Sequence, residues 1–462
     1  MAGNLKSRLE RIRAGSVGPG LPCHSRESSA FSVPVPRILP ESDTSRSPAS
    51  FFPPPWTVLD PLVLFRRRLV RWEEDSVLCS FLSCYEGKGR LSELSPSFLS
   101  ILFRGGESSS EDLTLQDLLF FDLETTGLSG GAGTVAFLAA FGILTEQGLE
   151  VRQYLLLDYP GEPIFLEYVH AELTGMEDRV LVSYNGKAFD IQILRNRFAM
   201  QGRLLRDQRH IDLLYISRLL WSGLLPSCSL GTLETQVLNR RREGDIPGAL
   251  APQIWFDFLR EGPHGSALEK LYGVCDHNVL DIVGLSSLFG MVLRIGSDPV
   301  GAIEERAFHL DRLALLWPEE ETRRILLQEA ALRGSLRARY ELARIARRSG
   351  EWERYRSLME ETADAADSVS ESAMVPRGAV LLWRLRANIQ LASYYEWKAR
   401  DYEAAIIRTR RAAALFVELS AERLRSGAKA ASPFINMKLE ERLNRLLAKQ
   451  QNGCPKKIGR QG

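Results

Sequence analysis

LLFFDLETTG, at residues 118–127, combines a strand-length apolar run with two acidic residues and a glycine-bearing turn. Side chains two positions apart on a strand project to the same face, so we expect Asp122 and Glu124 to lie side by side. Phe121 and Leu123 then point into the core. Such a carboxylate pair can hold one or two hard divalent cations, because Mg²⁺ and Mn²⁺ prefer carboxylate oxygens. For an isolated D-x-E pair, a solvated acidic edge is the alternative.

The turn after the two acids supplies candidate substrate-binding residues. Thr125, Thr126 and Gly127 follow Glu124 directly. Glycine lets the chain turn tightly, and backbone N–H groups and threonine hydroxyls can then bind a ligand beside the carboxylates. A phosphodiester is a candidate ligand for this turn. Its hydrolysis also needs cations beside it, which polarise the phosphodiester and lower the pKa of the attacking water.

Apolar runs around this stretch predict an α/β fold. LLFFDLETTG, TVAFLAAFGILT and VRQYLLLDY have the length of strands and predict an antiparallel meander. IFLEYVHAEL then predicts a helix, RVLVSYNG a buried strand, FDIQILRNRFAMQG a helix, and HIDLLYI a strand that enters a helix near Leu219. The order βββαβαβα is typical of a mixed sheet covered by helices.

FFDLETTGL resembles the first motif of the DEDD exonucleases, the DnaQ-like group of the ribonuclease-H superfamily. The resemblance implies a ribonuclease-H-like mixed sheet, metal-dependent 3′→5′ hydrolysis of nucleic acid, and further acidic motifs. The second motif is an Asp that opens a helix after a buried strand. RVLVSYNGKAFDIQILRNR supplies it as Asp190, with Asn185 and Lys187 before it as candidate substrate-binding residues. An acid that only stabilises the helix dipole is the alternative for Asp190.

LYGVCDHNVLDIVGL, at residues 271–285, offers two frames for the last acidic motif, which the resemblance places on a late helix. Tyr272 precedes Asp276 by four residues, and His277 precedes Asp281 by four. Five residues of helix rotate by about 140°, so the two acids do not face one metal centre. Apolar residues flank Asp281, where a carboxylate is costly without compensating partners. We therefore expect Asp281 as the fourth acid and His277 as the general base, a helix-surface histidine being the alternative.

Further segments extend the resemblance to YprB-like ribonuclease-H-fold proteins over roughly residues 115–288. They are GGAGTVAFL, HIDLL with Asp212, TLETQVL and DIPG around Glu234 and Asp245, and HNVLDI. One feature departs from the DEDD pattern. Histidine-type members usually leave four residues between His and Asp, whereas His277 and Asp281 have the three-residue spacing of the tyrosine type. The resemblance gives Asp212 no direct metal role, and we expect it to support the site.

The combined motifs imply a two-metal centre for phosphodiester hydrolysis. Asp122, Glu124, Asp190 and Asp281 are then the ligands of two Mg²⁺ or Mn²⁺ ions roughly 3.5–4 Å apart. His277 accepts the proton of the attacking water. The expected substrate is a single-stranded or frayed 3′ end of nucleic acid. Its phosphates are candidates for contact with Lys187, Arg195 and Arg197, although solvated helix charges are the alternative for each residue.

Composition changes along the chain divide it into five parts. Residues 1–55 are rich in Ser, Pro and Gly and predict a flexible leader. Residues 56–112 predict a small β-containing extension that packs on the exonuclease domain at 113–296. Residues 300–450 carry apolar side chains at three-and-four spacing and predict a separate helical domain, followed by a tail at 451–462.

Two segments of the helical part resemble degenerate tetratricopeptide units. YELARIARRSGEWERYRSLMEETA and IQLASYYEWKARDYEAAIIRTRRAAAL each predict two helices joined by a short polar turn. The turns at Gly350 and Arg400 are farther apart than one repeat of about 34 residues, so plain helical hairpins are the alternative. Tetratricopeptide pairs build concave peptide-binding surfaces, which makes this region a candidate site for a protein partner.

The composition of the 462 residues narrows the functional class. A hydrophobic fraction of 45% with 25% charged residues is ordinary for a globular protein. No uninterrupted apolar run reaches the about 18 residues of a membrane span, and the amino terminus has no apolar signal core, so we expect a cytoplasmic protein without membrane contact. The six cysteines have no C-x-x-C spacing, which makes a zinc ribbon and a disulfide framework unlikely candidates.

A net charge of +1 confines nucleic-acid contacts to local patches such as Arg195, Arg197 and Arg240 to Arg242, for which a solvated face is the alternative. Two other functions fit the same sequence. One is a ribonuclease-H-fold domain that binds nucleic acid without cutting it. The other is a scaffold protein that acts through its helical region. The presence of all four acids favours hydrolysis over a domain that has lost its activity.

Overall fold

The computed structural model describes residues 48–78, 96–103, 113–127, 133–175, 179–305, 307–317, 319–366, 376–427, 429 and 432–452. Most of the expected leader, 1–47, and most of the expected tail, 453–462, lie outside these residues. The end of the expected leader is packed rather than flexible. Ala49 and Phe52 are buried, and the Phe52 ring contacts the rings of Trp56, Phe258 and Tyr272. The packed chain therefore begins before residue 56.

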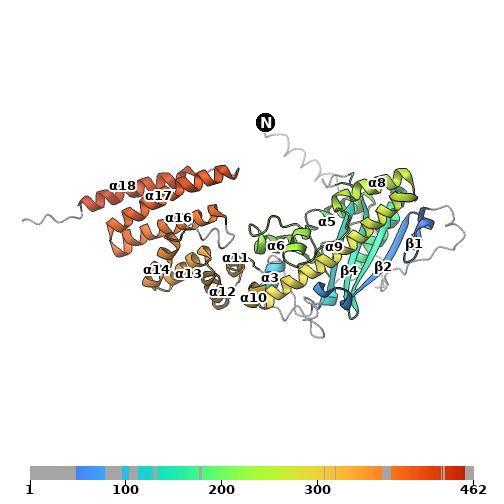
Figure 1. Cartoon of the computed structure of the whole chain (residues 1–462), viewed down its shortest axis with the longest axis horizontal. Helices are drawn as coiled ribbons and strands as arrows, with labels where there is room; N and C mark the ends of the chain where they lie inside the picture. The colour runs from blue at the N-terminus through green and yellow to red at the C-terminus, as the bar shows by residue number, and fades with distance from the viewer. Residues whose placement is uncertain are drawn as a thin grey trace, which may run out of the picture. The chain divides into compact units, whose positions relative to one another are not determined.

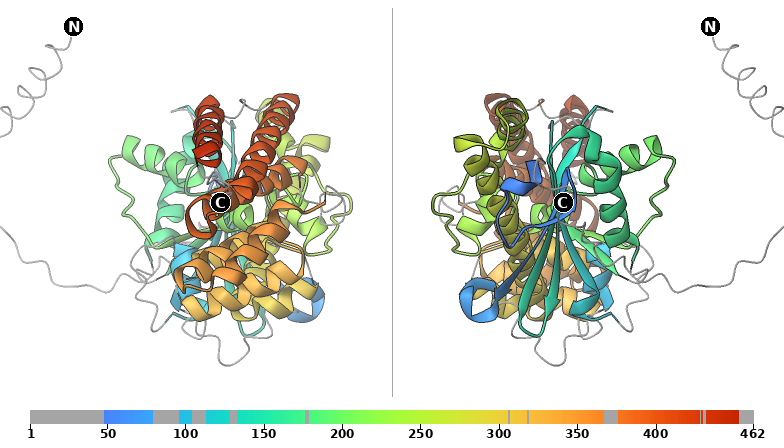
Figure 2. Two further views of the ribbon diagram at one scale, coloured as in Figure 1. Left: turned by 90° about the vertical axis from the view of Figure 1, so that its left-hand side faces the viewer. Right: turned by 90° about the vertical axis from the view of Figure 1, so that its right-hand side faces the viewer.

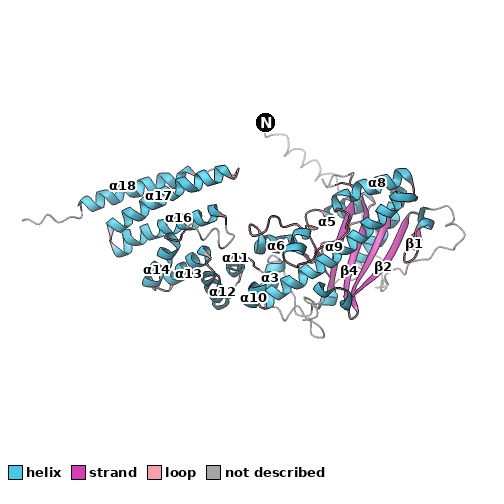
Figure 3. Cartoon of the chain, viewed as in Figure 1, coloured by secondary structure: helices cyan, strands magenta, loops and turns pink. Residues whose placement is uncertain are grey.

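The described strands form one seven-stranded mixed sheet in the order β1-β2-β5-β4-β3-β6-β7. Figures 1 and 3 show this sheet with α8 and α9 beside it. The strands are β1 (Thr57–Asp60), β2 (Val63–Arg71), β3 (Leu118–Thr125), β4 (Ala136–Thr145), β5 (Gly148–Leu156), β6 (Val180–Ser183) and β7 (His210–Asp212). β3, β4 and β5 are the expected antiparallel meander, and β6 and β7 run parallel to β3. The mixed α/β prediction is confirmed.

The hairpin of β1 and β2 shows what the 56–112 extension contributes. β2 pairs antiparallel with β5 along its whole length, from Val63 opposite Leu156 to Arg71 opposite Gly148. The extension thus adds two strands to the edge of the sheet instead of forming a separate unit. Beyond β2, the described part of the extension includes the helix α3 (Pro96–Phe103).

Side chains of β3 alternate between two hydrophobic cores on opposite faces of the sheet. Phe120 belongs to the core that contains most of α9 (Gly265–Ser297). Phe121 and Leu123 belong to the core that contains α4 (Glu162–Thr174) and α5 (Asp190–Met200). Figure 2 shows the sheet between helices on its two faces. Because strand side chains alternate, the two acids of β3 share the face of Phe120 and are directed toward α9.

The long helix α9 packs closely on that face. A side-chain carbon added at Gly142 of β4 would lie only 2.5 Å from Cγ2 of Ile282, so the glycine permits the close crossing. The rings of Phe120 and Phe289 lie 5.8 Å apart at the same interface. By length and composition α9 could cross a membrane, but 83% of its most apolar window is buried inside the protein. A helix buried to this extent is typical of a domain core.

The transition from β7 to its helix differs from the sequence-based expectation. β7 contains three residues, and α6 (Leu213–Trp221) follows it at once, whereas we expected the helix near Leu219. Asp212 caps this helix, because its carboxylate accepts a hydrogen bond from the Leu214 N–H at 3.1 Å. The other helices between the sheet and residue 305 are α7 (Leu230–Gln236), α8 (Ala251–Glu261) and α10 (Pro299–Glu305).

The C-terminal part is helical, as expected. Its elements are α11 (Leu310–Leu316), α12 (Glu320–Leu332), α13 (Leu336–Arg348), α14 (Trp352–Ala363), α16 (Arg377–Tyr394), the π-helix η9 (Tyr395–Ala399), α17 (Tyr402–Arg425) and α18 (Pro433–Asn452). α13 and α14 enclose the turn expected at Gly350, and α16 and α17 the turn at Arg400. Buried Glu396 of η9 accepts hydrogen bonds from Arg445 and Lys449, which holds α18 against it.

Candidate active site

Asp122 and Glu124 lie on β3 opposite the part of α9 that carries the last motif. Asn278 of α9 is fully buried, and its Nδ2 donates a hydrogen bond to Oδ2 of Asp122 at 2.8 Å. Ligand atoms of Glu124, His277 and Asp281 all lie within 4.8 Å of one another. The strand pair and the helix motif, more than 150 positions apart in the sequence, therefore meet at one point.

The structure places the two frames of the last motif in different surroundings. Asp281 points to the β3 acids, and its Oδ2 lies 3.2 Å from Nε2 of His277. Asp276 points elsewhere: its side chain is 55% exposed and forms ion pairs with Arg66 at 3.0 Å and Arg68 at 3.6 Å. Of the two acids, Asp281 is therefore the one that lies beside Glu124 and His277.

Asp190 joins the same cluster from the start of α5. It is 6% exposed, and the turn before it is tight, since a side-chain carbon at Gly186 would lie 2.4 Å from Oγ of Ser183 and 3.1 Å from Oδ2 of Asp190. Burial, followed by the negative charge of Asp212, raises the pKa of Asp190 to about 7. Burial thus outweighs the stabilisation that a helix N-terminus offers an ionised carboxylate.

Burial and mutual repulsion together make the ionised acids of this cluster costly. Burial, followed by the charges of Asp281 and Asp190, raises the pKa values of both Asp122 and Glu124 well above their usual range. Carboxylates that are buried and crowded by like charges are costly unless positive charge compensates them. A set of four carboxylates is also the donor chemistry that Mg²⁺ and Mn²⁺ prefer, so these residues fit divalent metal ions.

The expected substrate-binding residues occupy two turns beside the acids. The Thr125 hydroxyl donates to the Gly127 carbonyl at 3.0 Å, and the Thr126 hydroxyl accepts from the Val135 N–H at 3.0 Å. Both hydroxyls thus stabilise their own turn. A side-chain carbon added at Gly127 would lie 3.5 Å from Oγ1 of Thr134, which is an ordinary van der Waals distance. A lack of space therefore does not explain why residue 127 is a glycine.

The second turn, at residues 185–187, is fixed by Asp212. The Asp212 carboxylate accepts hydrogen bonds from the backbone N–H of Asn185 at 2.8 Å and from that of Lys187 at 3.1 Å. Asn185 adopts a left-handed conformation with φ 66° and is exposed. Asp212 is 4% exposed and does not need a metal to satisfy its oxygens. These contacts describe a supporting residue that positions the turn before Asp190.

Arg242 is the main residue whose role in the site sequence reasoning missed, since the sequence placed it only in a candidate surface patch. Its guanidinium forms ion pairs with Glu234 at 2.9 Å, Asp245 at 3.1 Å and Asp281 at 2.7 Å. The side chain of Arg242 is only 12% exposed, and that of Glu234 is 1% exposed. In the sequence the only signal was that Glu234 and Asp245 stand in segments that resemble the YprB-like proteins. In the structure the Arg242 guanidinium joins Glu234 and Asp245 to Asp281 of α9.

Most of the arginines expected as surface patches form ion pairs with acids of the described residues, and Arg241 is exposed. Arg240 pairs with Asp75 at 2.8 Å. Arg197 forms an ion pair with Glu162, which is 8% exposed, and Arg195 forms one with exposed Asp207. Arg197 and Arg240 therefore join elements of the domain, whereas Arg195 with Asp207 forms an exposed pair.

A chain of hydrogen bonds that runs from β2 and β5 through Asn278 of α9 supports Asp122. Gln153 of β5 is 1% exposed and donates from Nε2 to Oδ1 of Asn278 at 2.8 Å, while its Oε1 accepts from Nη2 of Arg66 at 2.6 Å. Because its Oδ1 accepts from Gln153, the Asn278 amide is oriented with its Nδ2 toward Asp122. The β2 strand of the extension thereby helps to position the first acid.

The raised pKa values predict how pH affects stability without metal. A group whose pKa is raised by folding contributes stability at low pH, and this contribution is lost as pH rises through the folded value, about 7 for Asp190. We expect Asp190→Asn, with EDTA present, to melt progressively higher than the native protein as pH rises from 5 to 8. Mn²⁺ should raise the melting temperature of the native protein more at pH 8 than at pH 5. Thermal melts at both pH values check this, and equal Mn²⁺ shifts would contradict it.

Comparison with known proteins agrees with this geometry. Residues 119–293 match the RNase_H superfamily. The chain is also 38% identical over 184 residues to a Bacillus subtilis (strain 168) protein described as "Uncharacterized protein YprB". That match covers 39% of this chain and 43% of the length of the relative. The family match, residues 119–293, spans all four acids.

Proposed function

We propose that this chain, whose residues 119–293 match the RNase_H superfamily and which is similar to YprB over 184 residues, is a metal-dependent 3′→5′ exonuclease of single-stranded nucleic acid ends. The observation that carries the proposal is the convergence of four carboxylates from β3, α5 and α9 beside one histidine. Asp122, Glu124, Asp190 and Asp281 are the proposed ligands of two Mg²⁺ or Mn²⁺ ions. Bound at this position, such cations supply polarisation of the phosphodiester and a lowered pKa for water.

His277 has the surroundings of a general base. Its Nδ1 lies 2.8 Å from both carboxylate oxygens of Asp245, and its Nε2 faces Asp281. A carboxylate on Nδ1 favours the tautomer with the proton on that nitrogen, so the lone pair of Nε2, 3.2 Å from Oδ2 of Asp281, is the proposed acceptor for a proton of the attacking water. The histidine chemistry thus operates with the short spacing that is usual for the tyrosine type. Asp245 orients the ring, and Gly248 packs against its other edge.

The two turns beside the acids are the proposed site for the terminal nucleotide. Asn185 is exposed in a strained left-handed conformation, and Asp212 fixes the backbone around it. Polar side chains on a fixed turn can bind sugar or phosphate groups without a large loss of conformational entropy on binding. Thr125, Thr126, Gly127 and Lys187 complete the proposed substrate-binding set.

We expect His277→Gln to lower the rate of hydrolysis by about 10²- to 10³-fold with little change in melting temperature, because the general base is lost. Asp245→Asn should lower the rate less, since the base remains but its orientation weakens. Single-turnover rates in Mn²⁺ give both values. His264→Gln is the matched control, because His264 is exposed and lies at the N-cap of the same helix. A native rate in His277→Gln would exclude the histidine as the base.

Labelled strands test the reaction and its direction. With a label at the 5′ end, 3′→5′ hydrolysis produces successively shorter strands, whereas a label at the 3′ end leaves at once as a mononucleotide. EDTA should stop both reactions. Internal fragments from both labels would indicate an endonuclease. An intact strand with Mn²⁺, for DNA and for RNA, would contradict hydrolysis and favour a domain that binds without cutting or a scaffold that acts through its helices.

A further inference from the structure

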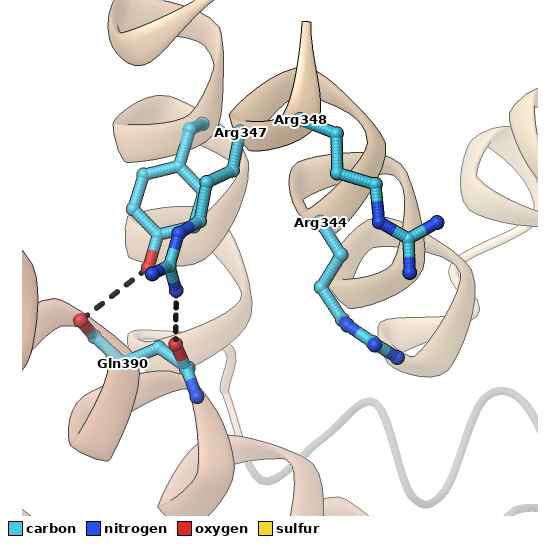
Figure 4. Close-up of a pocket in the computed structure, with 5 residues that line it drawn as sticks. Arg344, Arg347, Arg348 and Gln390 are labelled. Carbon is cyan, nitrogen blue, oxygen red and sulfur yellow. Dashed lines mark hydrogen bonds between the residues drawn. The ribbon is translucent and has the colours of Figure 1, made fainter. Parts of the chain in front are cut away.

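The helical part contains a pocket whose lining is dominated by arginine. Arg344, Arg347 and Arg348 of α13 line it together with Tyr355 of α14 and Gln390 of α16, around a cavity of about 410 Å³ (Figure 4). This volume lies within the range of about 300–1,000 Å³ that is usual for small-ligand sites. We refer to these five residues as the arginine pocket.

Two of the lining residues are held in place by the third helix. Nη1 of Arg347 donates to Oε1 of Gln390 at 3.3 Å, and the Tyr355 hydroxyl donates to the Gln390 carbonyl at 3.4 Å. Figure 4 shows Arg347 above Gln390, with the side chains of Arg344 and Arg348 to one side of them. Burial raises the pKa of Tyr355 to about 12, so its hydroxyl stays protonated at neutral pH and can donate a hydrogen bond.

Positive charge in this pocket exceeds the negative charge available to it. Arg344 pairs with Glu341 at 3.0 Å, while Arg348 is exposed and has no ion pair or hydrogen bond with any residue that the structure describes. α13 as a whole contains five arginines and one glutamate, and α16 contains three arginines and no acidic residue. Three guanidinium groups around one cavity therefore favour an anionic ligand that offers several oxygen acceptors.

Aromatic residues beside the pocket indicate which anion fits. Trp383 of α16 lies 5.3 Å from the Tyr340 ring, and the guanidinium carbons of Arg337 and Arg386 lie 5.7 and 4.7 Å from its ring. Neither arginine is ion-paired among the described residues, so no acid there neutralises their positive charge. Arginines that alternate with aromatic rings are typical of surfaces for single-stranded nucleic acid, whereas an acidic peptide has no need of the rings.

We propose that the arginine pocket binds the phosphates of single-stranded nucleic acid and thus forms a second nucleic-acid site, apart from the acid cluster. The choice of nucleic acid as the ligand rests on the proposed function. The guanidinium groups of Arg344 and Arg348 contact phosphate oxygens, and Trp383 with its two arginines extends the contact along α16. A protein partner for the helical region is then unnecessary to explain its charge.

The test is binding of the full chain to a fluorescein-labelled strand of about 30 nucleotides, DNA or RNA, in EDTA. Arg344→Ala/Arg348→Ala should raise Kd about tenfold near 100 mM salt. It should also flatten the slope of log K against log salt by about 1.4, since each lost phosphate contact removes roughly 0.7. The matched control is Arg324→Ala/Arg425→Ala, because both arginines lie on other helices and are paired with Glu321 and Glu422. This control should bind as the native protein does.

Competition separates the sources of the anion. An unlabelled strand should displace the labelled one at far lower concentration than inorganic phosphate or a glutamate-rich peptide. Native affinity and salt slope in Arg344→Ala/Arg348→Ala would overturn the proposal. So would a loss of peptide binding while strand binding is kept. Cleavage of a strand of about four nucleotides should be unchanged in this variant. If cleavage is absent even in the native protein, the proposed function fails, while binding in EDTA still decides the second site.

Discussion

Asp281→Asn should abolish metal-dependent shortening of a strand, with a loss on the order of 10³-fold or more, whereas Asp276→Asn should keep a rate within a few-fold of the native protein. The difference follows from their positions on α9. Asp281 lies with Glu124 and His277 inside 4.8 Å, and Asp276 is 55% exposed and paired with arginines of β2. An amide in place of the Asp281 carboxylate removes a negatively charged metal ligand.

The two variants are a matched pair, since each replaces one Asp of the same helix by its amide. Single-turnover rates in Mn²⁺ at equal protein concentration provide the comparison, with thermal melts to show that both variants are folded. Inactive Asp276→Asn together with active Asp281→Asn would assign the last motif to the Tyr272 frame. His277 would then lose its role as well.

Arg242→Ala should destabilise the protein by about 3–5 kcal/mol, the cost of leaving buried carboxylates without their cation. Glu234 is 1% exposed and relies on Arg242 for its ion pair, and burial raises the pKa of Glu234. For a domain of this size the loss corresponds to a fall in melting temperature of at least about 6 °C. Urea or thermal unfolding of the purified full chain measures it.

Neighbouring Arg241 supplies the control for this effect, because its side chain is exposed. Arg241→Ala should unfold within about 0.5 kcal/mol of the native protein. Adding Glu234→Gln to Arg242→Ala should recover part of the loss, since the buried charge is then removed as well. A destabilisation below 1 kcal/mol in Arg242→Ala would show that water or other residues satisfy these acids.

The local patterns of the sequence predicted the fold because they depend on neighbours in the chain. Period-two alternation around Asp122 placed its side chain on one face, and the pattern of strands and helices predicted the mixed sheet. Helical rotation between Asp276 and Asp281 limited the last motif to one acid. The structure brings Asp122, Glu124 and Asp281 together, and Asp190 acts on the first two through its charge.

Long-range contacts explain what the sequence could not predict. Arg242 lies in a loop and meets Asp281, 39 positions later, so no local period connects them. Asn278 stands next to His277, yet only the packing of α9 on β5 turns its amide toward Asp122 and Gln153. We expected the end of the leader to be flexible because the Ser, Pro and Gly content was judged over residues 1–55 as a whole. Ala49 and Phe52 of that segment nevertheless bury apolar surface in the core.

Asp122→Asn provides the most direct test of the account. The amide can still accept the hydrogen bond from Asn278, so the fold should remain intact while one metal ligand is lost. We expect the native protein to bind two Mn²⁺ ions in calorimetry and to shorten a 5′-labelled strand from its 3′ end. Asp122→Asn, purified in parallel, should bind Mn²⁺ far more weakly and leave the strand intact. Shortening at the native rate by folded Asp122→Asn would contradict the four-acid metal centre.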